Sequence, residues 1–351
     1  MKSFLSKITI FGSIFFTIIL APLLLPITHS TYRMWEALSA SNESLFDGKF
    51  YPNFNVHKIE VGDLAHHTQY AIPKEVSWQT DAFGFRNSVF VRTPDIVFIG
   101  ESNIAGSTLD QAETISSRVQ AKTSLSCVNL APYTFDEFLQ ALAEQVVDKP
   151  KYLIFGIIER EIPRLQGFTP KSDGVSFTKK LKRNFYVQTI LTQYDRASKY
   201  NFYRNLMARL SGSQGDGIQS PIDERMFFLH GQKSVLATDD AFVSNHADRI
   251  RSYADYCDSL GIQFVFFPIP NKETLYFELA QLDHQPAYLK KLHKKLLDRN
   301  VVAINTLALF TDYKKKQKEL LYHFDDAHWN GNAIELMASE LATLLSSFKK
   351  S

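Results

Sequence analysis

From Pro94 to the C-terminus the chain alternates short apolar segments with amphipathic ones, and this alternation is its strongest constraint on the fold. Five segments have the composition of buried strands: residues 95–99, 126–130, 152–158, 263–267 and 301–304. The segments between them carry apolar residues at helical spacing, near 110–123, 136–147, 245–260 and 273–298, and a last helix follows Asn330. Strands that alternate with helices predict an α/β fold, in which helices cover both faces of a mostly parallel, five-stranded sheet.

The alternation breaks at residues 165–242. This stretch holds a basic, aromatic helical segment, a loop rich in Gly and Ser at 211–220, and a hairpin pattern around 226–231. Such a length without strand–helix alternation is unusual in a compact unit, so we interpret it as an insertion. The predicted organisation is a membrane-proximal entry segment at 29–92, followed by the α/β domain at 93–348 that contains the insertion.

The N-terminus carries an uncharged run, residues 8–27, dominated by Ile, Phe and Leu. Twenty helical residues span about 30 Å, the thickness of the hydrocarbon core of a bilayer. Lys2 and Lys7 precede the run and favour a cytoplasmic N-terminus. We therefore expect residues 1–28 to anchor the chain in the inner membrane as a single span, with the rest on the periplasmic side. A cleaved signal peptide is the alternative, because Thr28-His29-Ser30 offers small residues for cleavage.

Charge and motif content exclude several other classes. The net charge is +2 over 351 residues, and no RRM, zinc-finger or helix-turn-helix signature is present, which argues against a nucleic-acid partner. The two cysteines have no zinc-like spacing. The sequence therefore implies no metal or nucleotide cofactor.

Two segments at opposite ends of the α/β pattern carry the candidate chemistry. Gly100-Glu101-Ser102 ends the first strand, and Asp325, Asp326 and His328 follow the last one. In parallel sheets the functional crevice lies outside the carboxyl ends of the strands. A serine hydroxyl becomes a nucleophile when a base takes its proton and a carboxylate orients that base. We expect Ser102 to be the nucleophile and His328 the base, with one of the two aspartates behind it.

These residues resemble the SGNH/GDSL hydrolase superfamily. Gly100-Glu101-Ser102 is similar to its first block, usually Gly-Asp-Ser, and Asp325-x-x-His328 to its last. The resemblance covers residues 94–348 and implies a flavodoxin-like three-layer sandwich. It looks closest to the membrane-anchored, alginate-type polysaccharide O-acetyltransferases, because of Asp-x-His-Trp-Asn at 326–330, Glu159-Arg160, and Pro-Ile-Pro-Asn-Lys at 268–272.

The chain also departs from the family pattern. The second block lacks its usual glycine, so a backbone N–H of Tyr133 or Thr134 would have to serve the oxyanion hole. The third block has Glu159-Arg160 where Asn is usual, and Arg160 either stabilises negative charge or forms a structural ion pair. The spacing in the wider superfamily favours Asp325 as the residue that orients His328, which is our preference, whereas the alginate-type spacing favours Asp326.

The function that the resemblance implies is O-acetylation of a cell-envelope or secreted polysaccharide through an acetyl-serine intermediate. The partners would then be a polysaccharide acceptor and a multi-pass membrane O-acyltransferase that delivers the acetyl group. A polysaccharide acetyl esterase with the same Ser-His-Asp triad is one alternative. A catalytically weak glycan-binding or scaffold subunit is another, and the altered second and third blocks are its support.

Overall fold

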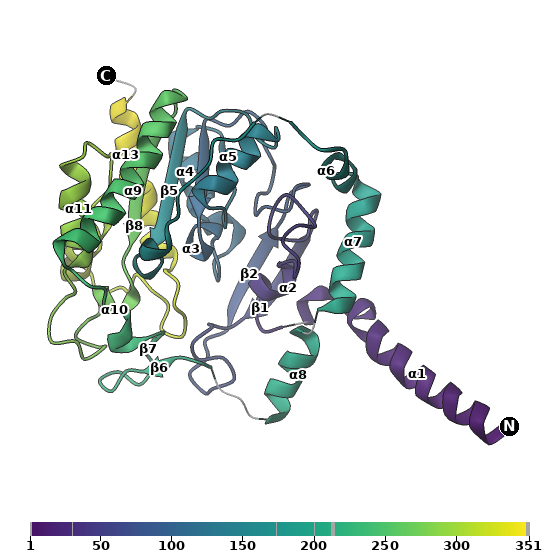
Figure 1. The fold of residues 1–351 in the computed structure, drawn as a ribbon. Helices are drawn as coiled ribbons and strands as arrows, with labels where there is room; N and C mark the ends of the chain where they lie inside the picture. The colour runs from purple at the N-terminus through teal and green to yellow at the C-terminus, as the bar shows by residue number, and fades with distance from the viewer. Residues whose placement is uncertain (1, 30, 173, 200, 212–214, 349–351) are drawn as a thin grey trace.

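The computed structural model describes residues 2–29, 31–172, 174–199, 201–211 and 215–348. Its centre is a four-stranded sheet in the order β4-β3-β5-β8, in which every pairing is parallel (Figure 1). The strands are β3 (Ile96–Gly100), β4 (Cys127–Asn129), β5 (Tyr152–Ile158) and β8 (Gln263–Ile269). The second strand in sequence lies outside the first, which is the strand order of flavodoxin-like sheets.

The fifth strand predicted at residues 301–304 is wrong. This segment forms only one parallel bridge to the sheet, between Phe266 and Ala303. Asn300, with a φ of +55°, turns the chain immediately before it, and Asn305 already caps the following helix. The extended stretch between these two residues is too short to form a ladder.

Helices cover both faces of the sheet and make it a three-layer sandwich. On one face lie α4 (Ile115–Thr123), α12 (Thr306–Lys316) and α13 (Gly331–Phe348), and on the other lie α5 (Phe135–Ala143), α9 (Asp240–Ser259) and α11 (Tyr288–Leu297). Each face of the sheet has its own hydrophobic core, and alternate residues of β3 point to opposite faces. Ile96 and Phe98 pack in the core on the α4 side, and Val97 and Ile99 in the core on the α5 side. Two short helices, α3 (Ser102–Ala105) and α10 (Lys272–Leu275), follow the carboxyl ends of β3 and β8.

The N-terminal segment packs against the first of these faces. It contains a short helix, α2 (Met34–Leu38), and a separate antiparallel pair, β1 (Asn55–Glu60) and β2 (Lys74–Gln79). Phe50 and Trp78 are buried in the same core as the residues of α4 and α13. The boundary at residue 92 stays a prediction, but side chains from both sides of it share one hydrophobic core.

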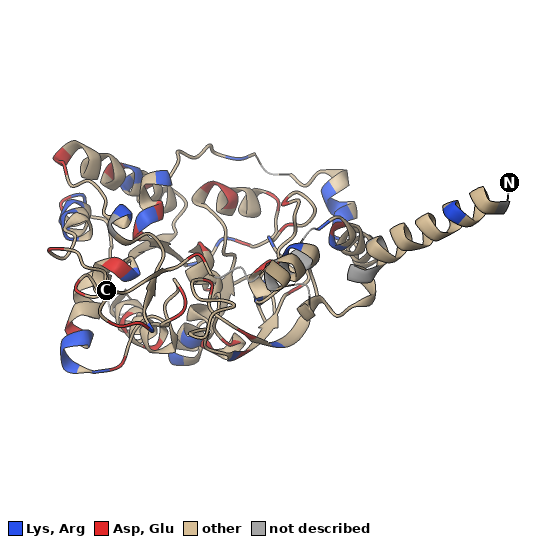
Figure 2. Cartoon of the chain, turned by 90° about the horizontal axis from the view of Figure 1, so that it is seen from below, with Lys and Arg blue, Asp and Glu red and all other residues tan. Residues whose placement is uncertain are grey.

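The stretch at 165–242 contains α6 (Phe177–Lys182), α7 (Phe185–Ser198), α8 (Asn201–Ser211) and a small antiparallel pair, β6 (Ile218–Gln219) with β7 (Phe227–Phe228). Helix α7 packs on the N-terminal segment, where the Tyr51 hydroxyl donates to the Asp195 carboxylate at 2.7 Å. The described residues also include the 3-10 turns η1 (Ile27–His29), η2 (Gln111–Glu113), η3 (Glu159–Arg164) and η4 (Gly231–Ser234). Acidic and basic residues are interspersed over the body (Figure 2).

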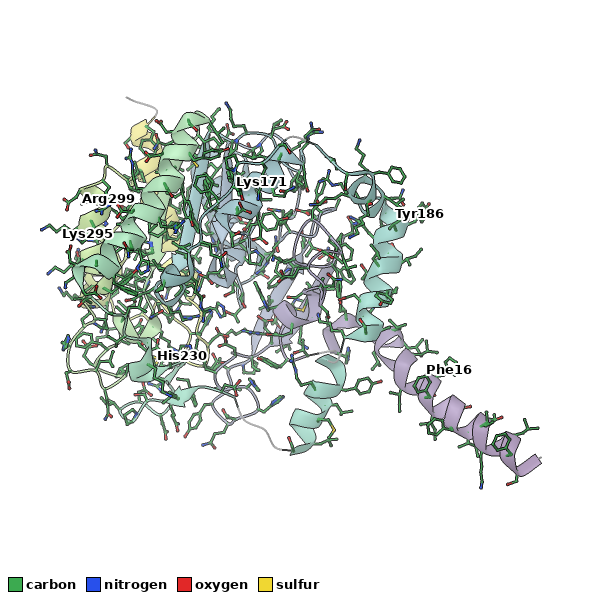
Figure 3. All side chains as sticks on the ribbon, viewed as in Figure 1. Phe16, Lys171, Tyr186, His230, Lys295 and Arg299 are labelled. Carbon is green, nitrogen blue, oxygen red and sulfur yellow. The ribbon has the colours of Figure 1, made fainter. Side chains whose placement is uncertain are left out.

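Helix α1 (Lys2–Leu24) projects away from the body (Figure 1), and its Phe16 is 62% exposed and points outward (Figure 3). In the part of the chain that the structure describes, no helix is long and apolar enough to cross a membrane. The prediction of a single-pass inner-membrane anchor over residues 1–28 is therefore wrong. The helix holds Lys7 in its second turn and ends at Leu24. Its uncharged part, residues 8–24, spans about 26 Å, less than the hydrocarbon core of about 30 Å.

Candidate active site

The turn after β3 places Ser102 at the carboxyl edge of the sheet. Gly100 ends the strand with a φ of +146°, and a Cβ there would lie 1.9 Å from the carbonyl oxygen of Gly156 on the neighbouring strand. Only glycine fits this position, so the chain can leave the sheet sharply. Glu101 then caps α3, and Ser102 is the first residue of that helix.

A continuous chain of hydrogen bonds joins this serine to the segment that follows the last predicted strand. The Nε2 atom of His328 lies 2.8 Å from the Oγ of Ser102, and its Nδ1 lies 2.5 Å from Oδ1 of Asp326. The same Asp326 oxygen accepts the backbone N–H of His328 at 2.8 Å. Trp329 fixes the two segments together, because its indole N–H donates to the carbonyl of Asn103 at 3.2 Å. A nucleophile, a base and an orienting carboxylate thus stand in line.

The expectation that Asp325 orients His328 is wrong. Its carboxylate is fully buried and points to the N-terminal segment, where it accepts the N–H groups of Gly62 and Ile72 at 2.9 Å and the Lys74 ammonium at 2.8 Å. Asp326 takes the place beside the imidazole, as in the alginate-type spacing. The chain turns at Asp325, so the two carboxylates point to different partners, and of the two it is Asp326 that contacts His328.

The buried pair of Asp326 and His328 holds a proton strongly. Burial alone would lower the pKa of His328, but the adjacent Asp326 carboxylate raises it above its ordinary value. Burial alone would raise the pKa of Asp326, but the charge and hydrogen bond of His328 hold it well below its usual range. The imidazole therefore gains a proton more readily than a histidine in water.

Asp63 and Arg33 belong to this site, and sequence reasoning missed both. The backbone N–H of Asp63 donates to Oδ2 of Asp326 at 2.9 Å, and its carboxylate accepts the N–H of Ala327 at 2.9 Å. Arg33 lies 3.1 Å from the other oxygen of Asp63. That oxygen is 3.9 Å from Nδ1 of His328. No local motif marks Asp63, because its partners Asp326 and Ala327 lie more than 250 positions later in the chain, and Arg33 joins the site through Asp63.

Asp63, Asp326 and His328 also have ligand atoms within 4.8 Å of one another, a spacing that a metal ion could bridge. These atoms already have partners within the protein, since Nδ1 of His328 contacts Asp326 and the Asp63 carboxylate contacts Arg33 and Ala327. We therefore describe the group as a hydrogen-bonded network.

Lys272 supports the same segment from the other side. Its side chain is buried, and its ammonium donates to the carbonyl oxygens of His323, Phe324 and Asp326 at 2.5, 2.9 and 3.0 Å. Burial lowers the pKa of Lys272 to about 8, against the opposing charge of Asp326. In the sequence, Lys272 is part of the Pro-Ile-Pro-Asn-Lys run at 268–272, which supports the family resemblance but does not indicate a role for the lysine.

Of the residues expected to stabilise an oxyanion, Tyr133 and Thr134 line a cavity together with Glu101, the residue before the nucleophile. The N–H of Thr134 donates to Glu137 at 2.8 Å as part of a capping box for α5. The Tyr133 carbonyl accepts the Gly100 N–H at 3.0 Å. Arg160 is half-buried, its N–H donates to Asn271 at 3.2 Å, and its side chain pairs with no acid among the described residues.

A cavity of about 680 Å³ opens beside these groups. It is lined by Gly100, Glu101, the segment 132–137, residues of η3 and the segment after it, and Tyr253. Tyr133 and Lys49 also line a second cavity of about 460 Å³, which reaches α6. Space for a ligand thus begins at the residue that precedes Ser102.

No family model matches the sequence, and no curated protein matches it. Solved structures with a similar arrangement include a lipase/acylhydrolase from Enterococcus faecalis, with 11% identity and a TM-score of 0.38 over 73% of this chain and 96% of that one. An acetyl-xylooligosaccharide esterase from Geobacillus has 12% identity and a TM-score of 0.36 over 71% of this chain and 92% of that one.

An acetyl xylan esterase from Butyrivibrio proteoclasticus has 8% identity and a TM-score of 0.31, over 80% of this chain and 67% of that one. At such identities the likeness concerns the course of the backbone alone. The expected closeness to alginate-type O-acetyltransferases has no counterpart among these structures.

Proposed function

We propose that the protein is a serine acyl-transfer enzyme that acts on acetyl esters of carbohydrates. The observation that carries the proposal is the hydrogen-bonded chain from Ser102 through His328 to Asp326. Two hydrogen bonds and burial hold the three groups in the order that nucleophilic acyl transfer requires.

In the first half of the reaction, His328 accepts the Ser102 proton at Nε2 while Oγ attacks the carbonyl carbon of the ester. The tetrahedral intermediate collapses when the alcohol leaves with the proton from His328, and an acetyl-serine remains. Asp326 stabilises the imidazolium and fixes its orientation through Nδ1. Backbone N–H groups of Ser102 and Tyr133 are our candidates for binding the oxyanion, and Arg160 is the candidate cation.

In the second half, a hydroxyl group attacks the acetyl-serine, and His328 accepts its proton and returns one to Ser102. Water gives hydrolysis, whereas a sugar hydroxyl gives transfer. We propose transfer to a polysaccharide as the physiological outcome, on the motif resemblance at residues 326–330 and 268–272, with the acetyl donor supplied by a partner protein. Hydrolysis is the second candidate, because the same residues perform it.

The carbohydrate in this proposal is supported by the cavity beside Glu101. Most of its charged groups are in ion pairs: Glu137 with Lys49 at 3.0 Å, Glu161 with Arg164 at 2.7 Å, and Asp136 with Lys171 at 2.7 Å. Glu101 instead accepts hydrogen bonds from Ser102 and Asn103. A lining of paired charges, hydroxyl groups and aromatic side chains suits a neutral ligand rich in hydroxyl groups.

The test uses 4-nitrophenyl acetate with the wild-type protein and the Ser102→Ala and His328→Ala variants. We expect turnover by the wild type alone, and mass spectrometry of quenched wild type should find one acetyl group on the peptide that contains Ser102. Adding candidate polysaccharides then shows whether acetyl appears on the sugar. Equal turnover by the wild type and Ser102→Ala would overturn the proposal, and removal of acetyl from glycans without any transfer would leave the esterase.

A further inference from the structure

Ser102 contacts a carboxylate that is not part of the Ser-His-Asp chain. Oε2 of Glu101 lies 2.9 Å from Oγ of Ser102, so the serine oxygen stands between this carboxylate and the His328 imidazole at 2.8 Å. The Ser-His-Asp mechanism described above makes no use of Glu101.

The Glu101 side chain is fixed in this position. Its Oε2 also accepts the backbone N–H of Asn103 at 2.9 Å, and Oε1 accepts the Asn103 amide at 3.1 Å. Asn103 is fully buried, and the backbone N–H of Trp329 donates to its side-chain oxygen at 3.3 Å. Every partner of Glu101 in this network carries a hydrogen to donate, so the carboxylate acts as an acceptor towards Ser102 as well.

The serine hydroxyl has one hydrogen and two acceptors that compete for it. When that hydrogen points to Glu101, the short contact between Oγ and Nε2 requires a hydrogen on Nε2. Since Nδ1 already shares a hydrogen with Asp326, the imidazole then carries two protons and cannot act as a base. When the hydrogen points to Nε2 of a neutral imidazole, Ser102 is ready to attack.

We propose that Glu101 is a catalytic residue that holds the free enzyme in the first of these states, with Ser102 turned to Glu101 and His328 doubly protonated. The site becomes active when His328 loses the extra proton to solvent and the Ser102 hydroxyl turns to Nε2. This inference rests on the acyl-transfer mechanism proposed above. In this proposal Glu101, the residue before the nucleophile, sets the pH above which Ser102 becomes active.

Other charged groups around His328 also influence its protonation. Asp326 and Asp63 face its Nδ1 side, and the charge of Arg33 acts on His328 and on Asp326. Lys74 and Lys272 act on His328 indirectly, through Asp326. The charges that act on the neighbouring Tyr322 hydroxyl include Arg160, Glu159 and Glu101 itself. Of the acids on this list, Glu101 is the one whose carboxylate contacts Ser102.

The first experiment measures kcat/KM for 4-nitrophenyl acetate against pH. Removing a negative charge from the Nε2 side lets the imidazole lose its proton more easily, so Glu101→Gln should move the acid limb of the profile down by about one pH unit. Glu101→Asp keeps the charge and should keep the limb near the wild-type position. Uniformly lower activity in Glu101→Gln, with an unmoved limb, would mean that Glu101 only caps α3.

The second experiment needs no substrate. With [13C]histidine incorporated, the titration of His328 can be followed by NMR and identified by its loss in His328→Gln. We expect its midpoint to fall in Glu101→Gln, and also in Ser102→Ala, which removes the bridging hydroxyl without touching Glu101. Wild-type midpoints in both variants would overturn the inference. If instead the midpoints fall but the wild type turns over no ester, the role of Glu101 stands and the proposed function fails.

Discussion

Gly62 lies so close to Asp325 that a Cβ on Gly62 would be 2.1 Å from the Asp325 carbonyl oxygen. The Gly62 N–H also donates to the Asp325 carboxylate at 2.9 Å. We expect Gly62→Ala to force the two segments apart and to lower the free energy of unfolding by about 1–3 kcal/mol. Turnover should fall by more than the loss of folded protein explains, because the displaced segment also holds Asp326, which orients His328.

Urea denaturation together with the 4-nitrophenyl acetate assay tests this prediction. Gly12→Ala is the matched control, since no atom lies within 4 Å of where its Cβ would be. Equal behaviour of the two alanine variants would show that the contact between Gly62 and Asp325 is unimportant.

The two neighbouring aspartates should behave differently on amidation. Asp326→Asn removes the charge that holds the imidazole and should lower kcat by about 10³–10⁴-fold in a folded protein. Asp325→Asn leaves the Lys74 ammonium without its carboxylate partner, so it should mainly lower the melting temperature. Circular dichroism melts and steady-state kinetics on both variants separate the two roles. The reverse pattern would return the orienting role to Asp325.

Lys272→Met should destabilise the protein by about 2–4 kcal/mol, because three backbone carbonyl groups lose the ammonium that they share. Turnover should also fall, since one of these carbonyls belongs to Asp326. Lys295→Met is the control: Lys295 (labelled in Figure 3) pairs with the exposed Asp240, so its loss should change the free energy of unfolding little. Similar losses in the two variants would contradict the role given to Lys272.

Glu159 should make stability fall as pH rises. Burial raises its pKa to about 7, from 4.5, so the folded protein keeps a proton that the unfolded chain has already released between these two values. The free energy of unfolding should therefore decrease across this window, by roughly 3 kcal/mol in total. Glu159→Gln should remove this decrease and be more stable than the wild type at pH 8, though not at pH 4. A parallel pH dependence of the two proteins in urea titrations would contradict it.

Local patterns predicted the sheet because each buried strand shows as an apolar run with a helix after it. The meeting of Ser102 and His328 was also predicted, from two local motifs: Ser102 follows the carboxyl end of β3, and His328 lies just before the last helix, although the strand predicted ahead of it does not form. The choice between Asp325 and Asp326 does not, because it depends on which way each side chain points in an irregular turn. Asp63 was beyond reach for a related reason: its partners Asp326 and Ala327 come from the other end of the chain, and a single sequence shows no trace of that pairing. Arg33 contacts the site through Asp63 and was missed with it.

Two misjudged elements had a different cause. The segment at 301–304 has strand composition, yet a turn and a helix cap on either side leave it no length for pairing. The N-terminal run has the composition of a membrane span, but composition does not show where a helix ends.

The contacts of residues 62–65 with residues 325–327 have a consequence for biosynthesis. Partners such as Gly62 and Asp325 are 263 positions apart, so synthesis must pass residue 325 before these contacts can form. Contacts of such separation close late and slow the approach to the native state. A ribosome-bound chain that already displays Ser102 therefore has no base beside it, and an incomplete chain cannot attack the esters around it.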